Sequence, residues 1–511
     1  MSNGVITIDN YIGGSFVAPG ANYLDVVDPS VPGKVIAKCG ISTAKDVDIA
    51  VEAAKKALPA WSKMTIKARA AIMMKFHSII QREAEDLARM IVLENGKNFT
   101  EAMAEVAKAN ETVEYACSLP QLAEGKTLRV SSQVTCEDRR LPLGVVASIV
   151  PFNFPLMVPM WTLPIALVMG NTVICKPSEK VPMTLRRVAE LAQEAGFPAG
   201  VFNLVNGVKE SVEALIDHPD VKAVTFVGSS PVAEIVSTRC RKLHKRCTSL
   251  GGAKNHLIAL EDCEPSSAAS DICVSFAGCA GQRCMAASVL LLVGGEVQEG
   301  LLAKVVELAS KIEPGSKPGQ MGPVIDEASY KKIIGYVTDA EKCGAEIILD
   351  GRPWNKKEGC KGNWIGPTII KHKQSSDKTM KEEVFGPVLS VYSVSSWEEA
   401  IAIENANPFG NAACIYTTNG GNAEWFLERF RAAMLGVNIG IPVPREPFSF
   451  GGLYGTKSKY GDMDITGDAA IEFFSNRIKV TSKWPITQSR KRSSEAVAGS
   501  TKDHANFAGS M

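Results

Sequence analysis

The segment LGVVASIVPFNFPLMVPMWTLPIALVMGNTVICK, residues 143–176, carries the clearest indication of the fold. It opens with a short β-branched run at 143–150, continues with a helix-like stretch at 155–170 and closes with a second apolar run at 171–176. The same alternation continues downstream, with a helix expected near 182–195 and strands at 200–205, 223–228 and 256–260. Four strand–helix repeats predict a parallel, doubly wound sheet, and such sheets bind ligands at the carboxyl ends of their strands.

The regions on either side of this sheet differ in character. Residues 44–117 place apolar residues every three or four positions and predict helices, with Gly96 as a stop signal. The second half repeats the alternation and predicts a second α/β domain, with helices at 264–283, 297–312 and 326–343 and strands at 287–293, 345–349 and 388–393. A late strand is expected at 472–484, followed by a polar tail that we expect to be disordered.

The composition of the 511-residue chain is that of an ordinary globular protein, with 45% hydrophobic and 22% charged residues. A net charge of +1 argues against nucleic acid or a membrane surface as a partner, and the basic run at 239–247 is interpreted as a solvated helix face. The thirteen cysteines form no CxxC pair, so no metal site is expected. The first residues lack the features of a secretion signal or transit peptide, and we expect a cytoplasmic protein with free thiols.

One stretch resembles a phosphate-binding turn. In TFVGSSPVAEIV, residues 225–236, Gly228 and Ser229 follow an apolar strand and lead into a helix. Gly228 allows a tight turn, and Ser229 offers a hydroxyl and a backbone N–H at the positive end of that helix. Many turns of this kind are plain helix caps, so this motif alone does not establish a nucleotide site.

Several short motifs occur in a fixed order along the chain. They are PFNFPL (151–156), KPSEKVP (176–182), FVGSS (226–230), GQRCMA (281–286), EEVFGPV (382–388) and NPFGN (407–411). Together they resemble the aldehyde dehydrogenase superfamily over nearly the whole chain up to Trp484. RLPLGV, GAKNH and IPVP…FSF further resemble the methylmalonate-semialdehyde dehydrogenase branch, whose members make acyl-CoA.

The resemblance implies a covalent mechanism. Cys284 matches the nucleophile that attacks the aldehyde, and Asn153 matches the side chain that forms the oxyanion hole with the backbone N–H of Cys284. Taken singly, each residue also has a structural explanation. Cys284 could be a packed thiol and Asn153 a helix cap.

The resemblance also implies NAD as the cofactor. Lys176 and Glu179 match the pair that holds the adenosine ribose, Ser229 lies at the pyrophosphate and Glu383 matches the ligand of the nicotinamide ribose. The charge of Glu179 would repel a 2′-phosphate, whereas Lys176 and Lys180 act in the opposite direction. The full set of expected cofactor residues is Val150, Phe152, Lys176, Glu179, Lys180, Ser229, Gly251, Glu383 and Phe385.

The expected division of the chain follows from the same resemblance. An NAD-binding domain spans 1–120 and 141–250, a catalytic domain spans 251–445, and oligomerisation strands lie at 121–140 and 472–484, before the tail at 485–511. The fold class is therefore α/β, with a doubly wound parallel-sheet cofactor domain, a second α/β catalytic domain and a small β oligomerisation extension. A homodimer or homotetramer is expected.

The segment TSLGGAKNH, residues 248–256, bears on how the acyl group leaves the enzyme. Hydrolytic members of the superfamily carry a glutamate here that activates water. This chain has Ser249 or Leu250 at that place, depending on the alignment, and neither is a base at neutral pH. A thiol such as coenzyme A is therefore the expected co-substrate. The alternatives are a hydrolytic enzyme with a base elsewhere, and an NAD-binding relative without activity.

The substrate is expected to be a small semialdehyde of the methylmalonate or malonate type. Arg283 matches one of two arginines that hold the substrate carboxylate in this branch. Lys108 stands at the other position, where it keeps the charge but loses the bidentate fork of arginine. This departure weakens the case for methylmalonate semialdehyde itself.

Overall fold

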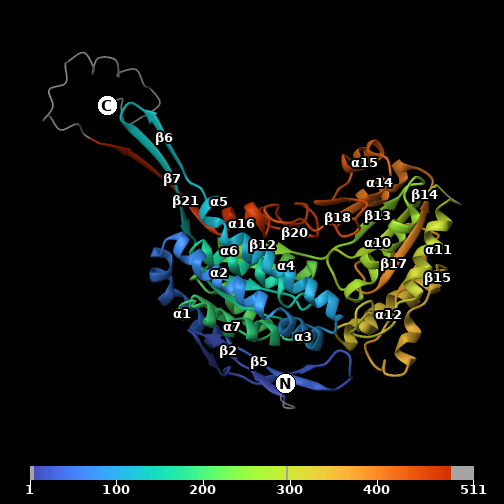
Figure 1. The fold of residues 1–511 in the computed structure, drawn as a ribbon, viewed down its shortest axis with the longest axis horizontal. Coiled ribbons are helices and arrows are strands. Elements are labelled where there is room, and N and C mark those ends of the chain that lie inside the picture. Colours follow the sequence, from blue (N-terminus) through green and yellow to red (C-terminus); the bar gives the residue numbers. More distant parts are fainter. Residues whose placement is uncertain (1–4, 295–296, 485–511) are drawn as a thin grey trace.

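A computed structural model describes residues 5–294 and 297–484 of the chain. The tail at 485–511, expected to be disordered, lies outside the described residues. Two large sheets dominate the described part, and Figure 1 shows them in two lobes that lie side by side. This α/β architecture confirms the predicted fold class.

The first lobe is built on an eight-stranded sheet. Its order is β20 (Lys459–Tyr460), β12 (Arg246–Leu250), β11 (Val221–Val227), β8 (Val145–Ile149), β9 (Thr172–Lys176), β10 (Phe202–Leu204), β2 (Asn10–Ile12) and β3 (Ser15–Val17). The strands from β12 to β10 are parallel, and β20, β2 and β3 pair antiparallel with their neighbours. Since the chain builds β9 and β10 on one side of β8 and then returns to place β11 on the other, the strand order reverses there. A crevice for a ligand is expected at such a point.

The second lobe is built on a seven-stranded sheet. Its order is β15 (Glu346–Leu349), β16 (Thr368–Lys371), β17 (Val388–Val394), β14 (Ala287–Val293), β13 (Asn255–Ala259), β18 (Ala412–Tyr416) and β19 (Met434–Val437). Among these described strands only β15 is antiparallel to its neighbour. Since β12 ends the parallel part of the first sheet and β13 lies inside the second, the chain crosses between the lobes at 251–254.

The helices cover the two sheets and fill the first lobe. They are α1 (Ala44–Lys63), α2 (Ile66–Arg82), α3 (Ala84–Asn95), α4 (Phe99–Cys117), α5 (Leu119–Leu122), α6 (Met157–Val168), α7 (Met183–Ala195), α8 (Lys209–Asp217), α9 (Ser230–Lys242), α10 (Pro265–Ala277), α11 (Val297–Ser310), α12 (Glu327–Lys342), α13 (Lys378–Lys381), α14 (Trp397–Asn405), α15 (Gly420–Leu427) and α16 (Gly467–Phe473). Every residue of α6 is buried, because this helix packs among α2, α4 and α16 as well as on the sheet.

Several helix ends test the sequence predictions. Gly96 ends α3 in the left-handed region, with φ 88°, which confirms it as a stop signal. The helix predicted to reach 283 ends instead at Ala277, because Cys279 and Ala280 have positive φ. The basic run at 239–247 is not one helix face, since α9 ends at Lys242 and Arg246 begins β12.

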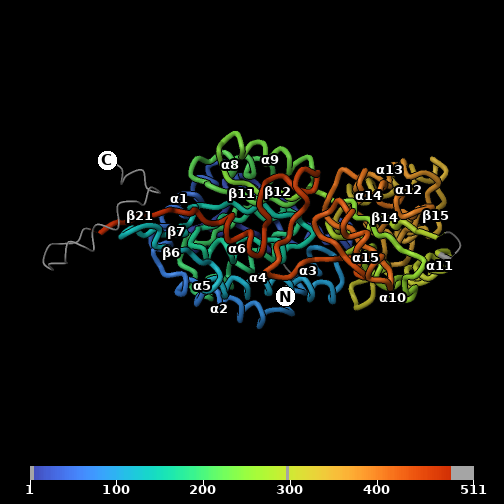
Figure 2. The backbone as a smooth tube through the Cα atoms, turned by 90° about the horizontal axis from the view of Figure 1, so that it is seen from above, coloured from blue at the N-terminus to red at the C-terminus, as the bar shows by residue number. Residues whose placement is uncertain are grey.

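Two smaller sheets complete the structure. The N-terminal sheet has the order β1 (Ile6–Ile8), β5 (Val35–Gly40) and β4 (Tyr23–Val27). The other has the order β21 (Ser475–Lys483), β7 (Val134–Pro142) and β6 (Lys126–Ser131), and it projects from the first lobe as an arm (Figures 1 and 2). The late strand predicted from 472 begins at Ser475, because the residues before it form α16.

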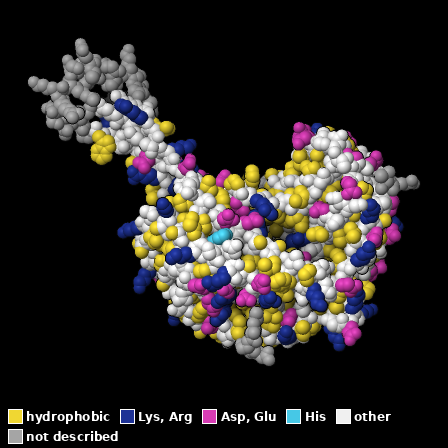
Figure 3. Space-filling model, viewed as in Figure 1, with side chains coloured by type: hydrophobic (Ala, Val, Ile, Leu, Met, Phe, Trp, Pro, Cys, Tyr) yellow, Lys and Arg dark blue, Asp and Glu magenta, His cyan; other side chains and the backbone are white. Residues whose placement is uncertain are grey.

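The face of the molecule in Figure 3 carries interspersed Lys, Arg, Asp and Glu side chains and no broad basic area. In the part of the chain that the structure describes, no helix combines the length and apolar character needed to cross a membrane.

Candidate functional site

Most of the residues singled out from the sequence lie on segments where the two lobes face each other. The first lobe contributes the loops that follow β8, β9 and β11, at the carboxyl ends of its parallel strands. The second lobe contributes the segments that precede β13, β14 and β17, at the amino ends of its strands.

Cys284 lies in the loop between α10 and β14. The loop begins with Cys279 and Ala280 in the left-handed region, with φ of 53° and 51°, and Gly281 follows with φ 65°. The Cys284 carbonyl accepts hydrogen bonds from Asn255 Nδ2 at 2.8 Å and from Asn411 Nδ2 at 2.9 Å. The nucleophile candidate is therefore fixed through its backbone, which leaves its side chain free of these contacts.

The Cys284 side chain is half-buried at a narrow cavity of about 10 Å³, room for roughly one water molecule. Lys254, Glu383 and Phe385 line the same cavity. Burial raises the pKa of the Cys284 thiol to about 12, and the nearby Glu383 carboxylate adds to the shift. The thiol is therefore protonated at neutral pH in the protein without ligands.

Asn153 follows β8 and reaches across to the loop that carries Cys284. Its Nδ2 donates a hydrogen bond to the carbonyl of Gln282 at 3.0 Å, two residues before Cys284. The Asn153 carbonyl accepts from Lys97 Nζ at 2.9 Å. The side-chain amide carries two N–H donors, so one remains for an oxygen atom bound beside Cys284.

The residues expected at the adenosine end lie at the ends of β9 and β11. Lys176 Nζ lies 3.6 Å from Glu179 Oε2, and Lys180 Nζ is paired with Asp326 Oδ2 of the second lobe at 2.6 Å. Ser229 is exposed and precedes α9, and among the described residues its side chain makes no capping hydrogen bond. The donors at this helix end therefore fit the phosphates of a dinucleotide.

The residues expected at the nicotinamide end come from both lobes. Glu383 Oε1 accepts a hydrogen bond from the backbone N–H of Ala253 at 2.8 Å, and a side chain at Gly252 would collide with the same carboxylate. Desolvation raises the pKa of Glu383. The rings of Phe152 and Phe385 pack edge-to-face with centroids 6.0 Å apart. The Glu383 carboxylate, as an acceptor for hydroxyl groups, and the backbone-only approach at Gly252 fit a dinucleotide held across the two lobes.

The remaining two expected cofactor residues are backbone positions near these groups. Val150 is buried, and its N–H donates to the carbonyl of Lys176 at 3.1 Å. Gly251 donates its N–H to the carbonyl of Ser458 at 2.9 Å, and an added side chain there would meet Lys457 and Ser230.

Ser249 and Leu250 are the two residues that could occupy the position of the hydrolytic glutamate, and they lie on opposite faces of β12. Ser249 Oγ lies 3.2 Å from the sulfur of Cys247, on the face of β12 that packs against α9. Leu250 points to the other face, where it belongs to the apolar cluster against which Cys284 packs. Of the two, Leu250 thus lies on the face of β12 that carries the same large apolar cluster as Cys284.

The two expected substrate residues make contacts within the protein. The Arg283 guanidinium donates to the carbonyl of Val274 at 2.6 Å, at the end of α10, and Arg283 Nε is buried without a hydrogen-bond partner among the described residues. Lys108 Nζ is paired with Glu446 at 2.9 Å and Glu111 at 3.1 Å. Arg283 lines the cavity at Cys284, whereas Lys108 is not one of its lining residues.

Three residues of the site were not singled out from the sequence. Lys254 lines the cavity, and burial lowers its pKa to about 7. Asn255 and Asn411 hold the Cys284 carbonyl. All three lie in the motifs GAKNH and NPFGN, which mark them as candidates. Their partners are distant in the chain, however, and Asn411 and Cys284 are 127 positions apart.

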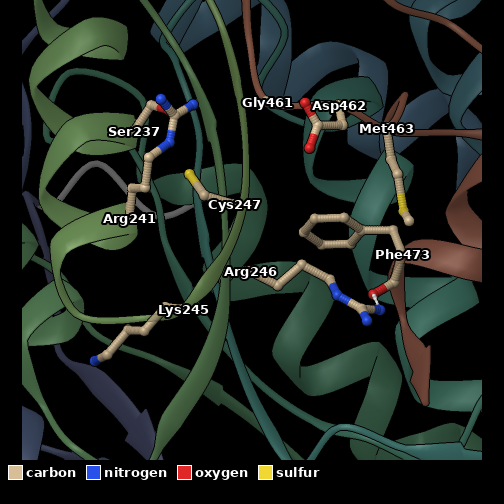
Figure 4. A pocket seen from close by; sticks show the side chains of 9 residues that line it. All are labelled: Ser237, Arg241, Lys245, Arg246, Cys247, Gly461, Asp462, Met463 and Phe473. Carbon is tan, nitrogen blue, oxygen red and sulfur yellow. Dashed lines mark hydrogen bonds between the residues drawn. The ribbon is translucent and has the colours of Figure 1, made fainter.

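A larger cavity, of about 260 Å³, lies away from the thiol between α9, β12 and the segment 461–473 (Figure 4). Arg241, Lys245 and Arg246 give it a basic lining. Arg246 donates to the carbonyl of Phe473, and Lys245 donates to carbonyls at the end of α8. Two of the three cations are thus already bound to backbone carbonyls.

The chain is similar to known proteins over nearly its whole length. The model of the aldehyde dehydrogenase family matches residues 16–480. Malonate-semialdehyde dehydrogenase 1 of Geobacillus thermodenitrificans is 42% identical over 488 residues, which cover 95% of this chain and 100% of that protein. Malonate-semialdehyde dehydrogenase of Halalkalibacterium halodurans is 40% identical, with 93% of this chain and 98% of that protein covered.

Solved structures give the same result. The methylmalonate-semialdehyde dehydrogenase of Oceanimonas doudoroffii superposes with a TM-score of 0.92 at 38% identity, covering 94% of this chain and 99% of that one. A Sinorhizobium meliloti 1021 protein, assigned as a methylmalonate-semialdehyde dehydrogenase and solved in complex with NAD, superposes with a TM-score of 0.93 at 34% identity. The match covers 95% of this chain and 100% of that one.

Proposed function

The chain belongs to the aldehyde dehydrogenase family, and on that basis we propose that it oxidises a small semialdehyde with NAD and transfers the acyl group to coenzyme A. The observation that carries the proposal is the meeting of Cys284, Asn153 and Glu383 between the lobes, with Leu250 on the side where a hydrolytic base would stand. The names of the relatives point to the same reaction class.

The first half of the proposed reaction uses the cysteine. The Cys284 thiol releases its proton to water, and its sulfur attacks the aldehyde carbon, which places negative charge on the former carbonyl oxygen. The second N–H of Asn153 Nδ2 and the backbone N–H of Cys284 donate to that oxygen. NAD, when bound, supplies the hydride acceptor. Loss of hydride from the tetrahedral adduct leaves a thioester on Cys284.

The second half removes the acyl group. Water is a weak nucleophile without a base, and Leu250 cannot take its proton. The thiolate of coenzyme A attacks the thioester carbon, the Cys284 thiolate leaves, and acyl-CoA is released. The half-buried site limits water at the thioester, which supports transfer to a thiol over hydrolysis.

The substrate is proposed to be a semialdehyde with a short carboxylate-bearing chain, of the malonate or methylmalonate type. Arg283 lines the cavity, and its buried Nε, which has no partner among the described residues, is a donor that a carboxylate would satisfy. Lys108 would take part only if its pair with Glu446 opened. Malonate semialdehyde is therefore the first substrate to test.

We also propose a homodimer or homotetramer in the cytoplasm. The arm of β6, β7 and β21 carries exposed apolar residues that a second copy would cover. All thirteen cysteines are free, which fits a reducing compartment.

The test measures NADH formation from a panel of small aldehydes with and without coenzyme A. With malonate semialdehyde and NAD alone, the protein should release about one equivalent of NADH per site and then stall, because the thioester persists. Coenzyme A should restore steady turnover, and mass spectrometry should identify acyl-CoA. Cys284→Ala should abolish NADH formation while NAD still raises the melting temperature.

Two outcomes would contradict the proposal. Steady turnover to the free acid without any thiol would show a hydrolytic enzyme with a base elsewhere. A wild-type protein that NAD does not stabilise against heat, and that forms no NADH from any aldehyde, would show a relative without activity.

A further inference from the structure

Two acidic residues of α4 contact the two loops that carry the reactive groups. Glu101 and Glu105 lie four residues apart and therefore share one face of the helix. Glu101 Oε1 accepts a hydrogen bond from the backbone N–H of Cys279 at 2.6 Å. Glu105 Oε1 accepts from the N–H groups of Leu156 at 2.8 Å and Met157 at 3.2 Å, at the start of α6.

Glu105 also takes part in a buried ion pair that reaches Asn153. Lys97 Nζ lies 2.6 Å from Glu105 Oε2 and donates to the Asn153 carbonyl at 2.9 Å. The side chains of Lys97 and Glu105 are 1% and 0% exposed. A buried pair is tolerated only when its remaining donors and acceptors are used, and here the backbone on either side of Phe154 uses them. Asn153 is thereby fixed by Lys97 at its own carbonyl and by Glu105 at the start of α6, a few residues further along.

The aromatic ring next to Asn153 packs on the same ion pair. Lys97 Nζ lies 4.2 Å from the centre of the Phe154 ring, within the range of a cation–π contact. The pair therefore contacts three successive features of one loop, which are the Asn153 carbonyl, the Phe154 ring and the N–H groups at the start of α6.

Glu101 acts on a backbone in an unfavourable conformation. Cys279 and Ala280 both have φ near +50°, which residues other than glycine adopt only when their surroundings hold them there. The Cys279 N–H is held by Glu101, whose other oxygen accepts from the N–H of Asn98 at 3.2 Å in a capping box. A carboxylate anchored at the start of α4 thus fixes the first residues of the loop that leads to Cys284.

We propose that Glu101 and Glu105, together with Lys97, are positioning residues that keep the two halves of the oxyanion hole in register. The two halves are the side-chain amide of Asn153 and the backbone N–H of Cys284, and register here means their position relative to each other. Glu101 sets the loop that presents Cys284, and the Lys97–Glu105 pair sets Asn153. This inference rests on the proposed function, because the register matters to catalysis only if Cys284 attacks a carbonyl. The three residues act through the backbone of the two loops, and a shift of about 1 Å in such a site can cost about 10²-fold in rate.

The first test compares Glu101→Ala and Glu101→Asp with wild type, and uses Glu114→Ala, an exposed acid of the same helix, as the matched control. Glu101→Asp keeps the charge but shortens the reach to Cys279. The rate of the NADH burst with malonate semialdehyde should fall about 10–100-fold in Glu101→Ala and at least fivefold in Glu101→Asp. The dissociation constant of NAD should stay within about twofold of wild type, and Glu114→Ala should keep the wild-type burst.

Two further measurements distinguish a positioning role of Glu101 from a folding defect of the variants and from an error in the proposed reaction. A deuterium isotope effect on turnover, measured with aldehyde deuterated at the reacting carbon, should grow in the Glu101 variants as hydride transfer becomes limiting. Alkylation of Cys284 by iodoacetamide, which needs no aldehyde, should become at least threefold faster as the loop relaxes. This second readout tests the loop even if the wild type oxidises no aldehyde.

Glu105→Asp tests the other half of the oxyanion hole. It keeps the charge opposite Lys97 but withdraws the carboxylate from the start of α6, so the burst rate should fall at least fivefold. Because the hydrogen bonds of Glu105 go to Lys97, Leu156 and Met157 and not to the loop that leads to Cys284, alkylation of that thiol should stay within about twofold of wild type. A fall in burst rate without a change in alkylation assigns the defect to Asn153.

The inference would be overturned by folded Glu101 variants with a wild-type burst and a wild-type alkylation rate. If Glu101→Ala does not fold, Glu101→Asp decides by the same criteria. A folded Glu105→Asp protein with a wild-type burst would remove the Lys97–Glu105 pair from the proposed role.

Discussion

Among single residues, Cys284 has an acidity set by its burial. Because burial raises its pKa to about 12, the thiolate is a small fraction at neutral pH and grows about tenfold with each pH unit. Alkylation by iodoacetamide in the absence of ligands should therefore accelerate about tenfold from pH 7 to pH 8 and again to pH 9. Mass spectrometry of the peptide that contains Cys284 measures the rate. A rate that rises only about three- to sixfold from pH 8 to pH 9 would show that the thiol has an ordinary pKa.

The same argument predicts an effect of Glu383. Its carboxylate raises the pKa of Cys284, so Glu383→Gln should lower that pKa and speed alkylation at pH 8 by a few-fold. Glu382→Gln is the matched control, because Glu382 is exposed and accepts a hydrogen bond from Tyr336. Equal alkylation rates in the two variants would mean that Glu383 has no influence on the thiol.

Leu250 offers a test of why the acyl group needs a thiol acceptor. It belongs to the apolar cluster that packs against Cys284, so Leu250→Glu would bring a carboxylate to the side of the thioester. A positioned base is worth roughly 10²–10⁴-fold, and we expect NADH turnover without coenzyme A to rise at least tenfold, with free acid as the product. Leu250→Gln, of similar size but without a base, should not show this gain.

The outcome of this substitution distinguishes two explanations. A Leu250→Glu protein that binds NAD and gives a full NADH burst, yet hydrolyses no faster than Leu250→Gln, would show that the missing base is not what blocks water.

Among the helices and strands, those that follow a regular period could be predicted from the sequence. The strands β8, β9 and β11 and the helices α6 and α7 lie within a few residues of their expected ranges, since apolar runs alternate clearly there. Strands β12, β16, β18 and β19 were not identified. Strands β16 and β19 have only four residues each. Strand β12 begins with Arg246, whose guanidinium is satisfied by carbonyls near the end of α16, a contact that no local pattern reveals.

The site could be predicted to a similar extent. Cys284, Asn153 and Glu383 could be singled out as candidates because their motifs are local and distinctive. The supports of these residues were missed. Lys97, Glu101 and Glu105 lie at or in a helix with an ordinary amphipathic pattern, and their partners are separated from them by 51 to 178 residues in the chain. A buried charge on such a helix looks like an exposed one until the fold is known.

The loop after β9 gives a prediction about cofactor choice. Glu179 lies 3.6 Å from Lys176 and would repel a 2′-phosphate, while Lys180 is bound to Asp326. Glu179→Ala should raise the ratio of kcat/KM with NADP to that with NAD at least tenfold, because the repulsion disappears and Lys176 remains. Glu190→Ala, in the following helix, is the control and should leave the ratio unchanged. An unaltered ratio in Glu179→Ala would place the choice of cofactor elsewhere.

The root of the arm is held by an ion network that should fail in acid. Hydrogen bonds from Arg477 and Arg140 lower the pKa of Glu472 to about 2, from 4.5. A depressed pKa means that the stabilisation is present above pH 4.5 and is lost as pH falls towards 2. Glu472→Gln should therefore lower the melting temperature at pH 7, and the difference from wild type should shrink below about pH 4. Because Glu472 is partly exposed, high salt should reduce the effect; a difference that does not depend on pH would contradict this account.

At the scale of the whole molecule, the arm is the part that has no hydrophobic core of its own. It is a three-stranded sheet in which β21 pairs with β7 over nine residues, and β6 and β21 are its outer strands among the described residues. Figures 1 and 2 show it projecting from the first lobe. Sheets this small are marginal when isolated, and exposed apolar side chains on them indicate a partner surface. Those side chains are Leu128, Val130, Leu141 and Ile478, which are 62%, 44%, 45% and 43% exposed.

A charge on this surface should therefore weaken assembly without unfolding the subunit. Leu128 is the most exposed of the four, so Leu128→Glu costs the isolated subunit little but would bury a carboxylate in any interface the arm forms. Light scattering after size exclusion at about pH 7 should give a smaller particle for Leu128→Glu than for wild type. Thr127→Glu places the same charge on the opposite face of the sheet, which carries Leu141 and Ile478, and so tests that face separately. If both variants and the wild type have the mass of one subunit, the arm does not join copies of this chain.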